Sequence, residues 1–124
     1  MSKPGKVGIA RVTDAFGYSM KGFAAAWKFE AAFRQEVTLG LILIPVAFWL
    51  ATTHIELILL IASIFWVWMA ELANSSVEAV VDRTGSERHE LSGRAKDIGS
   101  ALVFVSLSLL VIVWGIVAVH RFCF

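Results

Sequence analysis

The sequence is poor in charged residues and in cysteine. Asp, Glu, Lys and Arg make up only 17% of its 124 residues, whereas a soluble domain averages about 25%. The one cysteine, Cys123, excludes a disulfide within the chain. A net charge of +1 gives no indication of nucleic-acid binding, and we expect no such partner. What remains is one small and unusually apolar domain.

Short motifs for phosphate or metal chemistry are also missing. The chain contains no GxGxxG, CxxC or HExxH pattern. Residues 17–23, GYSMKGF, place two glycines at the P-loop spacing, but Phe23 follows where a P-loop needs lysine, and no strand precedes them. Any nucleotide chemistry therefore rests on something other than a standard nucleotide-binding fold.

Three long apolar stretches are present, at about residues 31–51, 55–81 and 98–119. A spanning helix needs about 20 largely apolar residues, and the third stretch contains no charged residue at all. Pro45, inside the first stretch, is tolerated in a membrane helix. Five Trp and nine Phe suit a protein that meets lipid interfaces. The sequence predicts an all-α membrane protein whose residues 30–124 form three transmembrane helices.

The distribution of Lys and Arg predicts the orientation of these helices. No Lys or Arg lies between the first two stretches. The segment before the first stretch and the connector 82–97 hold most of them: Lys3, Lys6, Arg11, Lys21, Lys28 and Arg34, then Arg83, Arg88, Arg94 and Lys96. We therefore expect a cytoplasmic N-terminus and a periplasmic C-terminus.

Residues 1–29 carry a helical pattern of their own. Apolar residues recur at spacings of three and four, as one stripe of a helix does: Ile9, Val12, Phe16, Met20, Phe23 and Trp27. Lys21 and Lys28 fall off the stripe. This pattern is typical of a basic amphipathic helix lying in the headgroup plane, and the alternative is a helix packed on a soluble partner.

A polar stripe interrupts the second apolar stretch. On a helix, Glu71, Asn74, Glu78 and Asp82 fall within about 80°. Glu71 lies 15 residues after Glu56, about 22 Å along the axis, in a hydrocarbon core about 30 Å thick. A carboxylate at that depth costs a few kcal/mol. Polar residues can simply hold membrane helices together, but four on one face that opens toward water favour a functional site.

Two kinds of chemistry fit such a stripe. Clustered carboxylates near water can hold Mg²⁺ beside phosphate oxygens, and a half-dry carboxylate can act as general base. A proton or cation pathway would use the same residues. The connector 82–97 adds charged groups, with Gly85 and Gly93 expected to mark turns. His89 taken alone is more typical of a solvated loop.

Three segments carry a resemblance to a known family. "EAAFRQE" (30–36), "ELANSSVEAVVDR" (71–83) and "GSERHELSGRAKDIGSA" (85–101) resemble the bacterial integral-membrane diacylglycerol kinases, over about residues 11–114. The resemblance implies a homotrimer in the inner membrane, with active sites at subunit interfaces. It also implies transfer of the γ-phosphate of MgATP to diacylglycerol, giving phosphatidic acid.

The resemblance further implies roles for individual residues. Glu71 matches the general base, Glu30 and Glu78 match the metal-binding pair, and Asn74 and Asp82 match supporting polar residues. Positions matching contacts to ATP are Arg11, Tyr18, Glu30, Glu78, Glu87, Arg88, His89, Lys96 and Asp97. Positions matching contacts to the lipid are Arg11, Ser19, Arg34, Gln35, Glu36, Trp49, Glu71, Ser100 and Trp114.

Two alternative functions stay open at this point. The nearer is a related lipid kinase that phosphorylates undecaprenol. The farther is a small transporter or proton-conducting bundle, which needs no ATP and leaves the polar start of the first span unexplained.

Overall fold

The computed structural model describes residue 5 and residues 7–85 and 89–124. This part of the chain forms four helices and no strand: α1 (Ile9–Phe29), α2 (Ala31–Leu50), α3 (His54–Arg83) and α4 (Glu90–Cys123). Helices α2, α3 and α4 are long and apolar enough to cross a membrane. The predicted all-α membrane architecture is confirmed.

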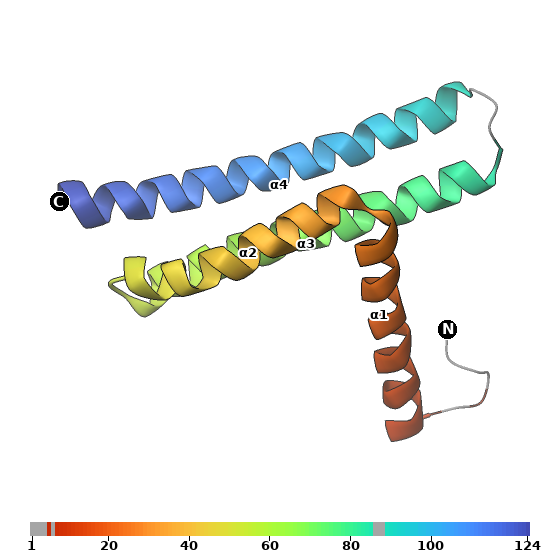
Figure 1. Cartoon of the computed structure of the whole chain (residues 1–124), viewed down its shortest axis with the longest axis horizontal. Helices are drawn as coiled ribbons and strands as arrows, with labels where there is room; N and C mark the ends of the chain where they lie inside the picture. The colour runs from red at the N-terminus through yellow and green to blue at the C-terminus, as the bar shows by residue number, and fades with distance from the viewer. Residues whose placement is uncertain (1–4, 6, 86–88) are drawn as a thin grey trace.

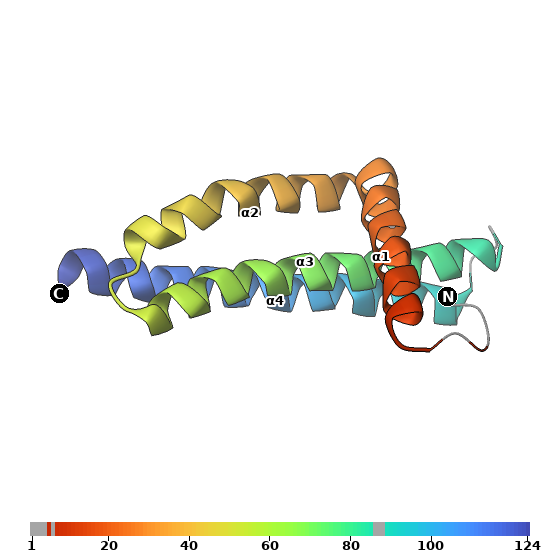
Figure 2. The ribbon, with the colours of Figure 1, turned by 90° about the horizontal axis from the view of Figure 1, so that it is seen from below.

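The three long helices run side by side, and α1 stands across them (Figure 1). Helix α3 is central, because it packs against both α4 and α2, and most extensively against α4. Both views show that the end of α3 and the start of α4 continue beyond the level of α1 (Figure 2). If α2, α3 and α4 cross the membrane, α1 therefore lies along its surface, and these helix ends project past that surface.

The apolar core lies at the end of the bundle opposite α1. It is formed by buried residues of all three long helices: Ala47, Leu50, Leu60 and Val117. Trp114 packs against this core, and its Nε1 donates a hydrogen bond to Oγ of Ser63 at 3.1 Å. Ser63 in turn donates to the Leu60 carbonyl at 2.7 Å. Because buried polar groups need partners, this chain of bonds fixes the register of α4 against α3.

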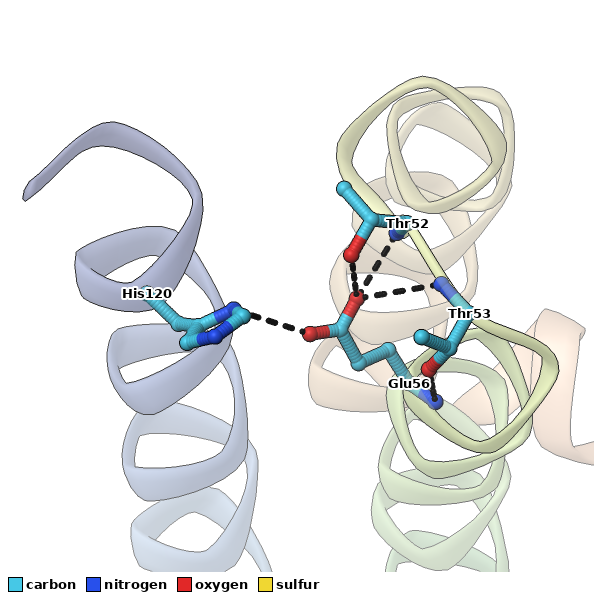
Figure 3. Close-up of polar contacts among 4 residues, drawn as sticks. All are labelled: Thr52, Thr53, Glu56 and His120. Atoms are coloured by element: carbon cyan, nitrogen blue, oxygen red, sulfur yellow. Dashed lines mark hydrogen bonds and ion pairs between the residues drawn. The ribbon is translucent and has the colours of Figure 1, made fainter. Parts of the chain in front are cut away.

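A polar clasp closes the same end of the molecule (Figure 3). Thr53 caps the N-terminus of α3 in a capping box with Glu56. Glu56 Oε2 also accepts hydrogen bonds from the backbone N–H and hydroxyl of Thr52 at 2.7 and 2.8 Å. Its other oxygen, Oε1, lies 3.3 Å from His120 Nδ1 on α4. The α2–α3 turn and the last turn of α4 are thus held together.

Helices α2 and α3 approach closely at Gly40. A Cβ atom there would lie 2.5 Å from Cζ2 of Trp68, so only glycine fits the contact. The Trp68 Nε1 donates to the Glu36 carbonyl at 2.9 Å, which satisfies the indole in an otherwise apolar setting. Helix α2 bends toward α3 in its second half, where Pro45 removes a backbone hydrogen bond (Figure 2).

Much of the apolar surface has no cover within the chain. The accessible surface is 9067 Å², whereas a compact soluble chain of this mass exposes about 6,600 Å². Along α1 the predicted stripe stays bare, with Phe16 65% and Trp27 47% exposed. Lipid, or further copies of the chain, must cover this surface.

The third long helix begins earlier than the apolar pattern indicates. Helix α4 starts at Glu90, eight residues before the expected apolar span at 98. Gly93 lies inside it, so the prediction of a turn there is wrong. A helical glycine costs only about 1 kcal/mol, and His89 caps the helix, its Nδ1 accepting from the Leu91 N–H at 3.0 Å. Gly85 follows the C-cap residue Thr84 and has a positive φ of 134°, a backbone conformation that favours glycine.

Candidate active site

Glu71 is the only buried ionisable side chain in the described part of the protein. It is 5% exposed and projects from α3 among the helices. Glu36, Glu78 and Glu30 lie near enough to repel a negative charge on it. The fold therefore gathers three carboxylates, from α2, α3 and the α1–α2 corner, around one buried acid.

Asn74 and Glu78 continue this cluster along α3. The Asn74 Nδ2 donates to Glu78 Oε1 at 3.3 Å, which places both side chains on one face as their spacing predicts. Helix α4 closes the cluster through Gly99, which is buried against the Asn74 side chain. Along α3 the cluster runs from Glu71 toward the end of the helix that projects beyond α1.

Glu30 occupies the corner between α1 and α2. It is at once the C-cap of α1 and the N-cap of α2, with extended backbone angles φ −118° and ψ 103°. One non-helical residue is sufficient to turn the chain from the surface direction into the bundle. The Glu30 carboxylate is thereby brought toward the acidic residues of α3.

A pocket of about 520 Å³ lies between α1 and α3 beside this corner. Its α1 side is mostly apolar, whereas its α3 side adds hydroxyl groups. The lining residues include Ser19, Phe23, Phe29, Glu30, Leu72, Ser75 and Ser76. A mostly apolar pocket with a few hydroxyl groups and one carboxylate suits an amphiphilic molecule at the membrane surface.

A second pocket, of about 860 Å³, lies where α3 passes into α4. It brings together four residues that the resemblance assigns to nucleotide contact or support: Asp82, His89, Lys96 and Asp97. Arg94 also lines it. The Lys96 Nζ lies 2.8 Å from Asp82 Oδ1, so its charge is directed into the pocket. Two exposed cations beside open space suit a polyphosphate.

The corner itself is held by Arg34. Its Nη1 donates to the carbonyls of Trp27 at 2.6 Å and Lys28 at 3.2 Å. These carbonyls belong to the last turn of α1, where carbonyl groups have no hydrogen-bond donor within the helix. Arg34 and the adjacent Gln35 also line an open hollow between α1 and α2. The arginine therefore joins the surface helix to the first spanning helix.

The remaining α1 residues of the predicted site are exposed. Arg11 and Tyr18 lie on the outer surface of the helix, with the Lys21 ammonium 5.7 Å from the Tyr18 ring. Ser19 donates to the Ala15 carbonyl at 3.0 Å and lines the α1–α3 pocket. These side chains face the surface layer, while the carboxylates lie deeper.

Two of the predicted lipid-side residues, Trp49 and Trp114, lie away from the carboxylates in this chain. Trp49 contacts Phe122 at the far end, with ring centroids 5.8 Å apart, and Trp114 belongs to the core there. Ser100 is exposed on α4. Glu87 and Arg88 lie outside the described residues.

Gly99 and Ser76 are parts of the site that the sequence patterns do not single out. Gly99 is the second residue of the uncharged apolar run that begins at residue 98. Its importance depends on which side chain of α3 it contacts. Ser76 lies off the acidic stripe but lines the α1–α3 pocket. For Gly99 the only signal in the sequence is that a small residue stands in a long apolar helix.

Comparison with known proteins identifies the family. Residues 17–118 match the family model described as prokaryotic diacylglycerol kinase. A diacylglycerol kinase of Haemophilus influenzae is 54% identical over 87% of this chain and 92% of its own length. The diacylglycerol kinases of Escherichia coli K12 and Helicobacter pylori 26695 are 50% and 42% identical, over 93% and 90% of this chain and 94% and 88% of their own lengths. The chain belongs to the prokaryotic diacylglycerol kinase family.

Proposed function

We propose that the protein is an ATP-dependent diacylglycerol kinase, which transfers the γ-phosphate of MgATP to diacylglycerol at the cytoplasmic face of the inner membrane. The observation that carries this proposal is the buried Glu71 carboxylate, which lies near the level where α1 crosses the bundle. A lipid hydroxyl is held at that level by the headgroup layer. Family membership supports the same reaction, and the product is phosphatidic acid.

The reaction asks Glu71 to accept one proton. The diacylglycerol oxygen attacks the γ-phosphorus, the bond from phosphorus to the β–γ bridging oxygen breaks, and ADP leaves. The hydroxyl proton passes to the Glu71 carboxylate. Phosphoryl transfer depends on positioning and charge neutralisation more than on covalent help, so a base held rigidly inside a helix bundle is adequate.

Glu30 and Glu78 would hold the magnesium ion that accompanies ATP. No group of three or more acidic, histidine or cysteine residues in the described ranges is arranged to hold a metal without help. The two carboxylates of Glu30 and Glu78 fit Mg²⁺, because this ion is usually bound by one or two carboxylates together with substrate phosphates and water. When bound, the ion would neutralise charge on the phosphates.

The α3–α4 pocket would hold the nucleotide. Lys96 would exchange its ion pair with Asp82 for a phosphate oxygen, with Asp97 and His89 beside it. Glu87, Arg88, Arg11 and Tyr18 would supply further ATP contacts. The pocket lies between the ends of α3 and α4 that project beyond α1, where ATP would arrive from water.

The lipid would enter by the α1–α3 pocket. Ser19 lies there, whereas Arg34, Gln35 and Glu36 lie at the neighbouring corner, close to where the glycerol backbone would sit. Trp49 and Trp114 lie further along the bundle, at depths that acyl chains or a neighbouring subunit reach. Ser100 follows Gly99 at the level of Asn74 and is exposed, so lipid or a neighbouring subunit would cover it. We propose a homotrimer with active sites between subunits, and the bare apolar surface supports such an assembly.

The test is transfer of label from γ-³²P-ATP to diacylglycerol in mixed micelles with Mg²⁺. Wild type should label phosphatidic acid, and Glu71→Gln should lose the activity by at least 10²-fold while keeping its gel-filtration profile, because a general base contributes roughly 10² to 10⁴. Glu56→Gln, in the clasp at the opposite end of the bundle, should keep it. Undecaprenol is assayed in parallel. Label in undecaprenol alone, or no label from folded wild type, would overturn the proposal.

A further inference from the structure

We propose that Gly99 is a positioning residue for phosphoryl transfer, because its lack of a side chain lets the Asn74 amide lie against α4 and keep its hydrogen bond to Glu78. The inference rests on the proposed kinase function. Gly99 itself touches neither substrate nor metal, and acts only through Asn74.

The contact between the two residues is specific. A Cβ atom on Gly99 would clash with Oδ1 of Asn74 and would lie 3.3 Å from its Cγ. The Asn74 side chain therefore fills the space that a residue with a side chain would occupy at position 99. Gly93 and Gly115, on the same helix, have open space at the equivalent position. Only Gly99, of the α4 glycines, is required by a close approach.

The orientation of the amide follows from both of its ends. Nδ2 donates to the Glu78 carboxylate at 3.3 Å, a bond that the oxygen end could not make. Oδ1 then faces Gly99 and is buried without a hydrogen-bond partner. An unsatisfied buried acceptor is a cost to stability. The fold accepts that cost while holding Nδ2 on Glu78, which indicates that the Glu78 orientation matters.

A methyl group at position 99 should displace the amide and leave the helices in place. The clashing atom is the end of a flexible side chain, so Asn74 can rotate away without moving backbone. Its hydrogen bond to Glu78 is then lost. Groups that orient a metal-binding side chain typically affect metal affinity or activity by 10–100-fold.

The first test is kinetic and uses four variants. Gly99→Ala should raise the KM for MgATP at least tenfold and leave the KM for diacylglycerol unchanged. Gly115→Ala, the matched control, should change neither. In the Asn74→Ala background the space is vacant, so Gly99→Ala should add nothing. Additive losses, or equal effects on both KM values, would mean that Gly99 serves only helix packing.

The second test does not depend on activity. Asn74 is the only asparagine of the chain, so selective ¹⁵N-Asn labelling gives the side-chain signal of a single NH₂ group, at one nitrogen frequency. Gly99→Ala should shift that signal and Gly115→Ala should not. An unshifted signal overturns the inference whatever the kinetics. A shifted signal with an unchanged KM for MgATP overturns the functional link, whereas an inactive wild type with the expected shift refutes only the kinase proposal.

Discussion

The four carboxylates of the site differ in how far they are removed from water. Glu71 is buried, whereas Glu30, Glu36 and Glu78 are half-buried. A carboxylate enclosed by helices is suited to exchange a proton with a substrate hydroxyl. Carboxylates that still reach water can bind a hydrated ion and release it with the product. The same side-chain chemistry thus supports two roles, separated by one or two turns of α3.

Glu78→Gln tests the metal role at this scale. Glutamine keeps the shape and can still accept from Asn74, but it loses the negative charge that Mg²⁺ prefers. We expect the KM for MgATP to rise by about tenfold or more, which corresponds to at least about 1.4 kcal/mol, with the KM for diacylglycerol unchanged. Steady-state rates at varied MgATP measure it.

The control for this experiment is Glu56→Gln. Glu56 lies in the clasp at the opposite end of the bundle, where its Oε1 is 3.3 Å from His120 Nδ1, so the substitution should leave both KM values as in wild type. An unchanged MgATP dependence in Glu78→Gln would remove Glu78 from the metal site.

At the scale of elements, the joint between α1 and α2 decides the shape of the α1–α3 pocket. One side of that pocket is α1, which packs on the rest of the chain much less than α3 packs on α2 and α4. Arg34 links the two helices across this corner, through hydrogen bonds to the Trp27 and Lys28 carbonyls. The angle of the surface helix therefore depends on one guanidinium.

Arg34→Gln should free α1 without unfolding the bundle. Glutamine is too short to bond both carbonyls, so we expect a broader distribution of distances between spin labels on α1, at Gly17, and on α3, at Ser76. Pulsed electron–electron double resonance in bicelles measures this distribution. Arg83→Gln, at the exposed end of α3, should leave it narrow. A narrow distribution in Arg34→Gln would show that lipid or other contacts hold the corner.

The elements were largely predictable, and the contacts between them were not. Apolar runs and the 3.6-residue period locate all four helices, because these features are local. The start of α4 at Glu90 is missed because Gly93 resembles a turn residue, and only the cap at His89 and the packing on α3 settle it. The face shared by Asn74 and Glu78 follows from spacing. The contact of Asn74 with Gly99 depends on the register of two helices, which no local pattern contains.

At the scale of the whole molecule, the distribution of Lys and Arg predicts one arrangement in the membrane. The clasp of Glu56 with His120 lies at one end of the bundle, and α1 with the acidic cluster lies toward the other (Figures 1 and 3). The prediction from Lys and Arg places the second end in the cytoplasm, where ATP is available. The C-terminus, including exposed Cys123, then faces the periplasm.

Cys123 provides a direct measurement of this arrangement, because it is the only cysteine. A membrane-impermeant maleimide should label wild type in spheroplasts and not in sealed inverted vesicles. The control is Cys123→Ser carrying Gly5→Cys, which should give the opposite pattern. If Cys123 reacted only in inverted vesicles, the predicted orientation would be wrong.

The corner at Glu30 combines a backbone role and a side-chain role in one residue. The backbone of this residue ends the helix that follows the membrane surface and begins the helix that enters the membrane. The side chain of the same residue belongs to the acidic cluster. Any force that tilts the surface helix must therefore also move this carboxylate. In mechanical terms Glu30 is a shared pivot, which couples the tilt of the surface helix to the position of a carboxylate that we propose binds Mg²⁺ and ATP.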